Sequence, residues 1–294
     1  MVNFKIPLKK FKKINGISIS YIDEGKGETI FCLPPWFSPS LVFVPLISQI
    51  GKKFRIISPD MPGWLGDSQK PTQTPDLMFY TQLVEDFIKS FGVKKINLLG
   101  YSHGGIIAQQ IVSRNIIFVK NLALISSPFG LESINKKFKL ILDFYDKVGQ
   151  KLISDQVVLR LVDNIMFLPM LREKKKEKGN QFDTLIEEIA KETNNVDAKS
   201  LILCFLSKTP ISLDLKKIKK IPTLIIYANK DDDFIKKDNE LMVVGLGIKP
   251  LYLPKADHCH LFFEAEKSAK IIGNFFGRKN IFEKVLNLFQ KLSQ

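Results

Sequence analysis

The 294-residue sequence predicts an α/β protein with a mostly parallel sheet, because short apolar strands alternate along it with segments of helical spacing. One long interval, residues 130–220, shows only helical patterns and predicts an all-helical insertion. A glycine-rich pentapeptide at 100–104 stands between a predicted buried strand and a predicted helix. At 45% apolar residues, the chain is long enough for one large domain with an inserted subdomain.

The strands differ in how they alternate. Residues 17–22 alternate apolar and polar side chains, as a half-exposed strand does, and the glycines of 23–28 then predict a turn. Buried strands are predicted from continuous apolar runs at 29–33, 55–58, 96–99, 122–125, 223–227 and 250–253.

Helices are predicted where apolar residues recur on one face. The sheet is flanked by predicted helices at 81–91 and 105–112, and the insertion carries helical patterns at 138–148, 157–165 and 185–189. Residues 277–294 predict a C-terminal amphipathic helix. We expect it to pack back on the protein, and a membrane-surface or dimerisation helix is the alternative.

The charge and the cysteine content limit the kinds of partner and site that we expect. The net charge is +14, and it comes mostly from lysines in short runs such as Lys9-Lys10. Lysines without interleaved arginines and aromatics predict a solvated surface and no nucleic-acid partner, and peripheral contact with an anionic membrane stays open. Three widely spaced cysteines suggest neither a disulfide framework nor a metal site, and no apolar run reaches the ~18 residues of a membrane span. We therefore expect a cytoplasmic protein; its oligomeric state stays open.

The pentapeptide Gly-Tyr-Ser-His-Gly at 100–104 predicts a nucleophile. A serine at a strand-to-helix turn is held in a strained conformation with its hydroxyl exposed, and the flanking glycines leave room for the bend. The N-terminus of the following helix favours developing negative charge at the same place. Ser102 is therefore the predicted nucleophile.

Together these features resemble the α/β-hydrolase family. Four segments carry the resemblance in the family's chain order: the serine turn at 100–104, Asp-Met-Pro-Gly-Trp-Leu-Gly-Asp-Ser at 60–68, the strand and acidic loop at 221–231, and the histidine loop at 255–261. The resemblance implies an eight-stranded, mostly parallel sheet flanked by helices with an inserted helical cap. It assigns residues 1–129 and 221–276 to the hydrolase core, 130–220 to the cap and 277–294 to a C-terminal extension.

The resemblance also implies a catalytic triad of Ser102, Asp231 and His258. The imidazole takes the serine proton, and the carboxylate fixes the imidazole in one tautomer. His260 is a weaker candidate for the catalytic histidine. We expect His260 instead to be a loop residue near the pocket mouth. For the acid, the count from Pro222 favours Asp231, whereas the following apolar pair would suit Asp232.

The loop after the third strand departs from the family pattern. The family usually has His-Gly there, whereas this chain has Pro-Pro-Trp-Phe at 34–37. Because proline has no N–H, the two oxyanion donors are expected to be the backbone N–H groups of His103 and Trp36. Candidate pocket residues are Trp36, Phe37, Tyr101 and Phe129.

These residues predict a serine hydrolase that cleaves a small-molecule ester of a small to medium apolar acyl group through an acyl-enzyme, with no metal or organic cofactor. Serine at the turn argues against the haloalkane dehalogenase and epoxide hydrolase relatives, which use aspartate there. Carbon–carbon or amide hydrolysis and acyl transfer use the same triad and stay open. A non-catalytic protein that binds an apolar ligand is the alternative from another class.

Overall fold

The computed structural model describes residues 4–73, 75–129, 147, 180–197, 200–201, 213–231 and 233–278. The predicted helix at 157–165, all of the predicted helix at 138–148 except residue 147, most of the predicted cap and nearly all of the predicted C-terminal helix lie outside the described residues. The domain boundaries expected from the sequence therefore stay predictions.

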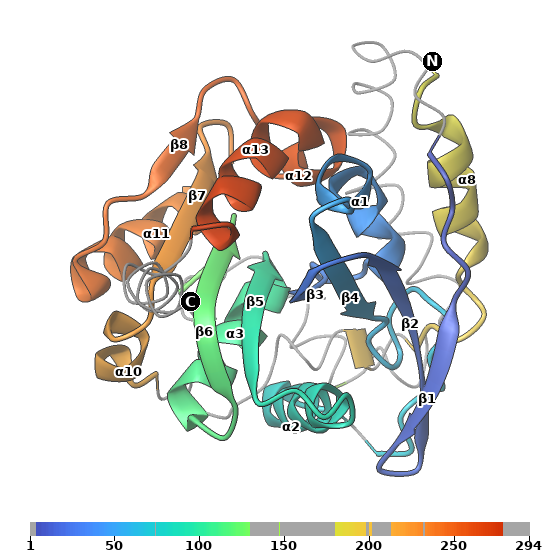
Figure 1. Cartoon of the computed structure of the whole chain (residues 1–294). Helices are drawn as coiled ribbons and strands as arrows, with labels where there is room; N and C mark the ends of the chain where they lie inside the picture. Colours follow the sequence, from blue (N-terminus) through green and yellow to red (C-terminus); the bar gives the residue numbers. More distant parts are fainter. Residues whose placement is uncertain are drawn as a thin grey trace, which may run out of the picture.

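Eight strands form one sheet in the order β1-β2-β4-β3-β5-β6-β7-β8 (Figure 1). The strands are β1 Lys10–Ile14, β2 Ile17–Gly25, β3 Glu28–Leu33, β4 Phe54–Pro59, β5 Lys95–Tyr101, β6 Phe118–Ile125, β7 Thr223–Ala228 and β8 Leu251–Leu253. Strand β2 is antiparallel to both β1 and β4, and every other pairing is parallel. The predicted fold class is confirmed, and β1 is a strand that the apolar pattern did not predict.

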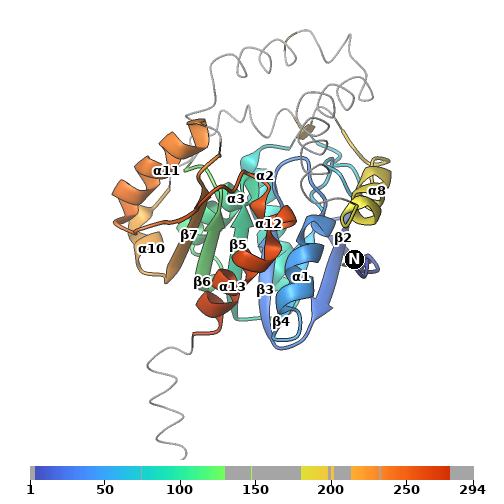
Figure 2. The same ribbon diagram turned by 90° about the horizontal axis from the view of Figure 1, so that it is seen from above.

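Helices cover both faces of the sheet, as Figure 2 shows from above. The described helices are η1 Ser40–Phe43, α1 Val44–Ile50, α2 Leu77–Lys89, α3 His103–Arg114, α8 Asp183–Lys191, α10 Leu215–Lys219, α11 Asp233–Leu246, α12 His260–Phe263 and α13 Ala265–Phe276. One core lies between the sheet and α2, α3, α10 and α11. The other lies between the sheet and α1, α12 and α13, where α8 also contributes.

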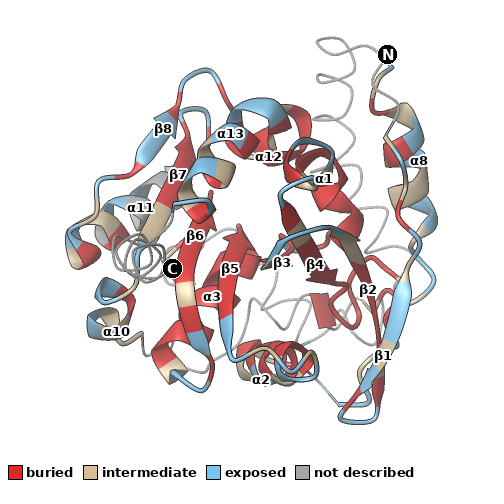
Figure 3. Ribbon diagram, in the orientation of Figure 1, coloured by how far each residue is buried: buried red, intermediate tan, exposed pale blue. Residues whose placement is uncertain are grey.

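Successive side chains of a central strand enter opposite cores. In β3, Phe31 and Leu33 belong to the first core, whereas Ile30 and Cys32 belong to the second. The period of two follows from strand geometry, and burial on both faces explains the continuous apolar runs. Figure 3 shows this burial in the central strands and the more exposed edges at β1 and β8.

The carboxyl ends of the parallel strands bring several loops together. In open α/β sheets, ligand sites form at this edge because the loops leaving neighbouring strands meet there. Here the loops follow β3, β5, β6, β7 and β8. Within the described part of the chain, none of the helices combines the length and apolar character that a membrane crossing requires.

Candidate active site

Ser102 lies at the sharp turn between β5 and α3. Its backbone has φ 51° and ψ −120°, a conformation that non-glycine residues rarely adopt. The turn is bonded on both sides: the N–H of Ser102 donates to the carbonyl of Ile125 at 2.8 Å, and the N–H of Gly105 donates to the carbonyl of Ser102 at 2.8 Å. The surrounding structure thus maintains a strained serine that is half-buried and still reachable.

The glycines around Ser102 permit backbone approaches that no side chain would allow. A Cβ on Gly100 would lie 2.4 Å from the Cα of Gly105, and one on Gly104 would lie 2.3 Å from the carbonyl oxygen of Leu33. Gly104 therefore does more than leave room for the bend. It brings the first turn of α3 against the loop that follows β3, where the second oxyanion donor is expected.

The structure brings Ser102, His258 and Asp231 together in one hydrogen-bonded chain. The Nε2 atom of His258 lies 3.0 Å from Oγ of Ser102, and its Nδ1 lies 2.7 Å from Oδ1 of Asp231. The Asp231 side chain is fully buried, whereas that of His258 is 30% exposed. Since a carboxylate only accepts hydrogen bonds, it selects the tautomer with a proton on Nδ1, which leaves Nε2 able to accept the serine proton.

Three loops are joined so that this chain forms. The N–H of Lys230 donates to the carbonyl of Ala256 at 2.9 Å, which ties the acid loop to the histidine loop. The hydroxyl of Tyr101 donates to the carbonyl of His258 at 2.6 Å, which ties the histidine loop to the serine turn. Asp232, the alternative acid, lies outside the described residues.

His260 is neither in a loop nor accessible, so the expectation of a loop residue near the pocket mouth is wrong. It is the first residue of α12 and fully buried, with Nδ1 2.9 Å from Oγ of Ser268 and Nε2 3.3 Å from Oγ of Ser126. Burial, followed by repulsion from His258, lowers the pKa of His260 to about 4. Its imidazole is therefore neutral at neutral pH and joins the end of β6 to α13.

The expected oxyanion and pocket residues fall in different environments. Phe37 is buried with φ 56°, and Trp36 is half-buried with Nε1 donating to the carbonyl of Leu201 at 2.8 Å. Phe129 is also half-buried and packs against the first core. The ring of His103 is buried edge-on against Trp64, with centroids 5.2 Å apart, so its ring does not take part in the hydrogen-bonded chain.

Tyr101 was expected in the pocket, and the structure corrects this. Its side chain belongs to the second core, is only 2% exposed, and uses its hydroxyl on the histidine loop. Because side chains alternate along β5, the residue before Ser102 enters the core under the loop.

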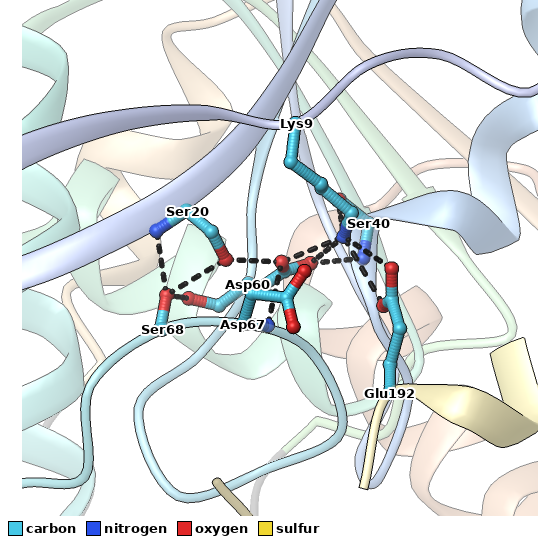
Figure 4. A network of polar contacts seen from close by, with 7 residues as sticks. All are labelled: Lys9, Ser20, Ser40, Asp60, Asp67, Ser68 and Glu192. Carbon is cyan, nitrogen blue, oxygen red and sulfur yellow. Dashed lines mark hydrogen bonds and ion pairs between the residues drawn. The ribbon is translucent and has the colours of Figure 1, made fainter. Parts of the chain in front are cut away.

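The loop at 60–68 is held by a buried ionic network that the sequence did not predict (Figure 4). Lys9 was expected on a solvated surface, yet its side chain is only 10% exposed, and its Nζ lies 2.6 Å from Oδ2 of Asp60 and 3.1 Å from Oε1 of Glu192. Asp60 also accepts from the N–H of Ser40 at 2.7 Å. Burial, then repulsion from Asp60, raises the pKa of Glu192 to about 7 although Lys9 opposes the shift.

Comparison with known proteins now gives the family. The model of the alpha/beta hydrolase fold family matches residues 29–241, well over half of the chain. The chain belongs to this family. A soluble epoxide hydrolase of a Corynebacterium species is 27% identical over 127 residues, which are 43% of this chain and 44% of that protein. An uncharacterized protein of Mycobacterium tuberculosis is 23% identical over 134 residues, 46% of this chain and 39% of that protein. These curated relatives are thus matched over less than half of their length.

Solved structures show the same fold at low sequence identity. An epoxide hydrolase of Bacillus megaterium superposes with a TM-score of 0.75 at 16% identity, over 92% of this chain and 100% of that chain. A bromoperoxidase of Bacillus anthracis gives 0.66 at 15% identity, over 92% and 100% of the two chains. Membership of the family therefore gives the fold of this chain and its general hydrolase class. The reaction itself depends on the residues at the site of this chain.

Proposed function

We propose that this α/β-hydrolase is a serine hydrolase that cleaves carboxylic esters of small to medium apolar acyl groups. The observation that carries the proposal is the hydrogen-bonded chain from Ser102 through His258 to the buried Asp231, at 3.0 Å and 2.7 Å. Distances of this size allow a proton to pass from serine to imidazole while the carboxylate stabilises the resulting charge.

In the proposed reaction, Oγ of Ser102 attacks the ester carbonyl carbon and its proton moves to Nε2 of His258. The oxyanion accepts hydrogen bonds from the backbone N–H groups of His103 and Trp36. The tetrahedral intermediate then expels the alcohol, which takes the proton from Nε2, and an acyl-enzyme remains. Water gives a proton to Nε2 of His258 and attacks the acyl carbon. The bond from that carbon to Oγ of Ser102 then breaks, Oγ takes the proton back from Nε2, and the acid is released.

The nucleophile argues for an acyl substrate over an epoxide. If a serine hydroxyl opened an epoxide, the product would be an ether to Ser102, which the water attack just described would not cleave. An acyl group instead leaves an ester on Ser102, and this ester has a carbonyl carbon for the water to attack. The half-buried aromatic side chains of Trp36 and Phe129 support an apolar acyl group.

The proposal is tested by labelling the purified protein with a fluorophosphonate, which reacts with activated serines and requires no knowledge of the substrate. We expect labelling at Ser102, located by mass spectrometry, and its loss in Ser102→Ala and His258→Ala. Ser48→Ala, which removes an exposed serine hydroxyl on α1, should label like the wild type.

Unlabelled protein from the same preparation is then assayed on p-nitrophenyl esters of increasing acyl length, and we expect turnover on the short and medium esters. A folded wild-type protein that is not labelled would contradict the proposal. In that case the alternative of a non-catalytic protein that binds an apolar ligand would replace it.

A further inference from the structure

Tyr101 is a buried polar residue for which the proposed reaction has no chemical step. It is the last residue of β5 and directly precedes Ser102 in the chain. Its ring lies in the second core with Ile125, Ala228 and Ala256, so its environment is apolar. A phenol in such surroundings is costly to bury unless its hydroxyl has a hydrogen-bond partner.

That partner is the backbone carbonyl of His258, 2.6 Å from the hydroxyl oxygen. Burial, then the neighbouring Cys259, raises the pKa of Tyr101 well above its ordinary value, so the phenol keeps its proton and remains the donor. The rings of Tyr101 and His258 also lie close, with centroids 5.8 Å apart and planes inclined by 32°. One side chain therefore contacts both the backbone and the ring of His258.

The histidine loop needs such support because it is irregular. It runs from the end of β8 to the start of α12, and Lys255 within it has φ 64°. Asp231 fixes the Nδ1 atom of the His258 ring but cannot by itself fix the backbone from which the ring projects. The Tyr101 hydroxyl holds that backbone at the carbonyl group of His258 itself.

Taken with the triad proposed above, the geometry points to Tyr101 as a positioning residue that sets the distance between Ser102 and His258. The two residues are 156 positions apart in sequence, yet Tyr101 is covalently joined to one and hydrogen-bonded to the other. A movement of the end of β5 therefore carries the serine and the histidine loop together, and their 3.0 Å contact is preserved.

The variant Tyr101→Phe removes only the hydroxyl and tests this inference. We expect fluorophosphonate labelling of Ser102 and kcat for an ester to fall about tenfold, with KM within about twofold, because a displaced base affects the reaction more than binding. The matched control is Tyr80→Phe, since Tyr80 is equally buried and its hydroxyl donates to the carbonyl of Pro62 at 2.9 Å. The control should label and turn over like the wild type.

A second readout separates positioning from general destabilisation and does not depend on catalysis. The sequence holds three histidines, so nitrogen-15 spectra of histidine-labelled protein contain three rings to compare. In Tyr101→Phe we expect the His258 ring signals to shift or broaden, while those of His103, whose ring packs against Trp64, stay in place. If the wild type does not react with the fluorophosphonate and Tyr101→Phe still shifts the His258 signals, the positioning role is supported and the proposed function is rejected.

Two outcomes would overturn the inference. One is labelling of Tyr101→Phe at the wild-type rate with unchanged His258 signals. The other is slower labelling with unchanged His258 signals and a lowered melting temperature, which would show that the hydroxyl only stabilises the fold.

Discussion

At Asp231 the carboxylate is fully buried and faces an imidazole that is 30% exposed. The asymmetry suits a group that has to remain fixed while its partner meets substrate and water. An amide at this position would have the size of the carboxylate, but its NH₂ group would donate and thereby favour the opposite imidazole tautomer.

We therefore expect Asp231→Asn to lower ester turnover by about 10⁴-fold, as loss of the correct tautomer does in serine triads. Turnover on a p-nitrophenyl ester measures this directly. Asp232→Asn is the matched control and should stay within about twofold of the wild type. Near wild-type turnover of Asp231→Asn, with loss in Asp232→Asn, would transfer the acid role to Asp232.

The environment of a single residue can be predicted from the sequence only when its structural neighbours are also its sequence neighbours. The sharp turn at Ser102 was predictable because the glycines, the strand before it and the helix after it are its sequence neighbours. The bond from Tyr101 to His258 spans 157 positions, so no local pattern could predict it. Lys9 resembled its exposed neighbours for the same reason, since its partner Glu192 is 183 positions away.

At the scale of elements, the central strands were predictable because burial on both faces requires continuous apolar runs. Strand β1 was not, because it lies at the sheet edge and carries Lys10, Lys12 and Lys13. Such an edge strand forms because it pairs with β2. Its charged residues also hinder pairing of its free edge with another strand. Its sequence therefore has neither alternation nor an apolar run.

The network of Lys9, Asp60 and Glu192 joins three elements: the segment before β1, the loop after β4 and the end of α8. The fully buried Asp60 and the partly buried Glu192 share one ammonium group, and Asp67 adds repulsion at Glu192. The pKa of Glu192 is about 7 in the folded state against an ordinary 4.5. Between these two pH values Glu192 is protonated in the folded chain and ionised in the unfolded chain. This group therefore lowers stability as the pH rises from about 4.5 through 7.

We expect Glu192→Gln to increase the free energy of unfolding relative to the wild type at pH 8 by more than at pH 5. Urea titrations at the two pH values measure the difference. Glu187→Gln, an exposed substitution on the same helix, should change stability equally little at both. An effect of Glu192→Gln that is the same at pH 5 and pH 8 would show that the residue does not titrate in this range.

For the whole molecule, His260 lowers the free energy of unfolding at acidic pH. Its pKa is about 4 in the folded state against an ordinary 6.5, so the unfolded chain takes up a proton that the folded one refuses. The stability from this residue is complete above pH 6.5 and is lost as the pH falls toward 4. At full effect the loss is about 3 kcal/mol.

In His260→Gln the free energy of unfolding should be lower than in the wild type at pH 7 and should fall less between pH 6.5 and 4. Chemical denaturation across this range measures the slope. Ile272→Val, a truncation in the core at α13, should lower stability by a similar amount at every pH and keep the wild-type slope. If His260→Gln also keeps that slope, another group causes the acid sensitivity.

The described residues of the predicted cap and the hydrogen-bonded triad depend on different strands. Three residues of this region are bonded to the loops after β3 and β4: Gly66 donates to the Glu192 carbonyl, Asp197 donates to that of Gly63, and Trp36 donates to that of Leu201. The triad instead comes from the loops after β5, β7 and β8. During divergence, substitutions around Glu192, Asp197 and Leu201 would therefore alter the surroundings of Trp36 first and the spacing of Ser102 and His258 last. Such a chain can accumulate variation around Trp36 while the contacts that join Ser102, His258 and Asp231 keep their geometry.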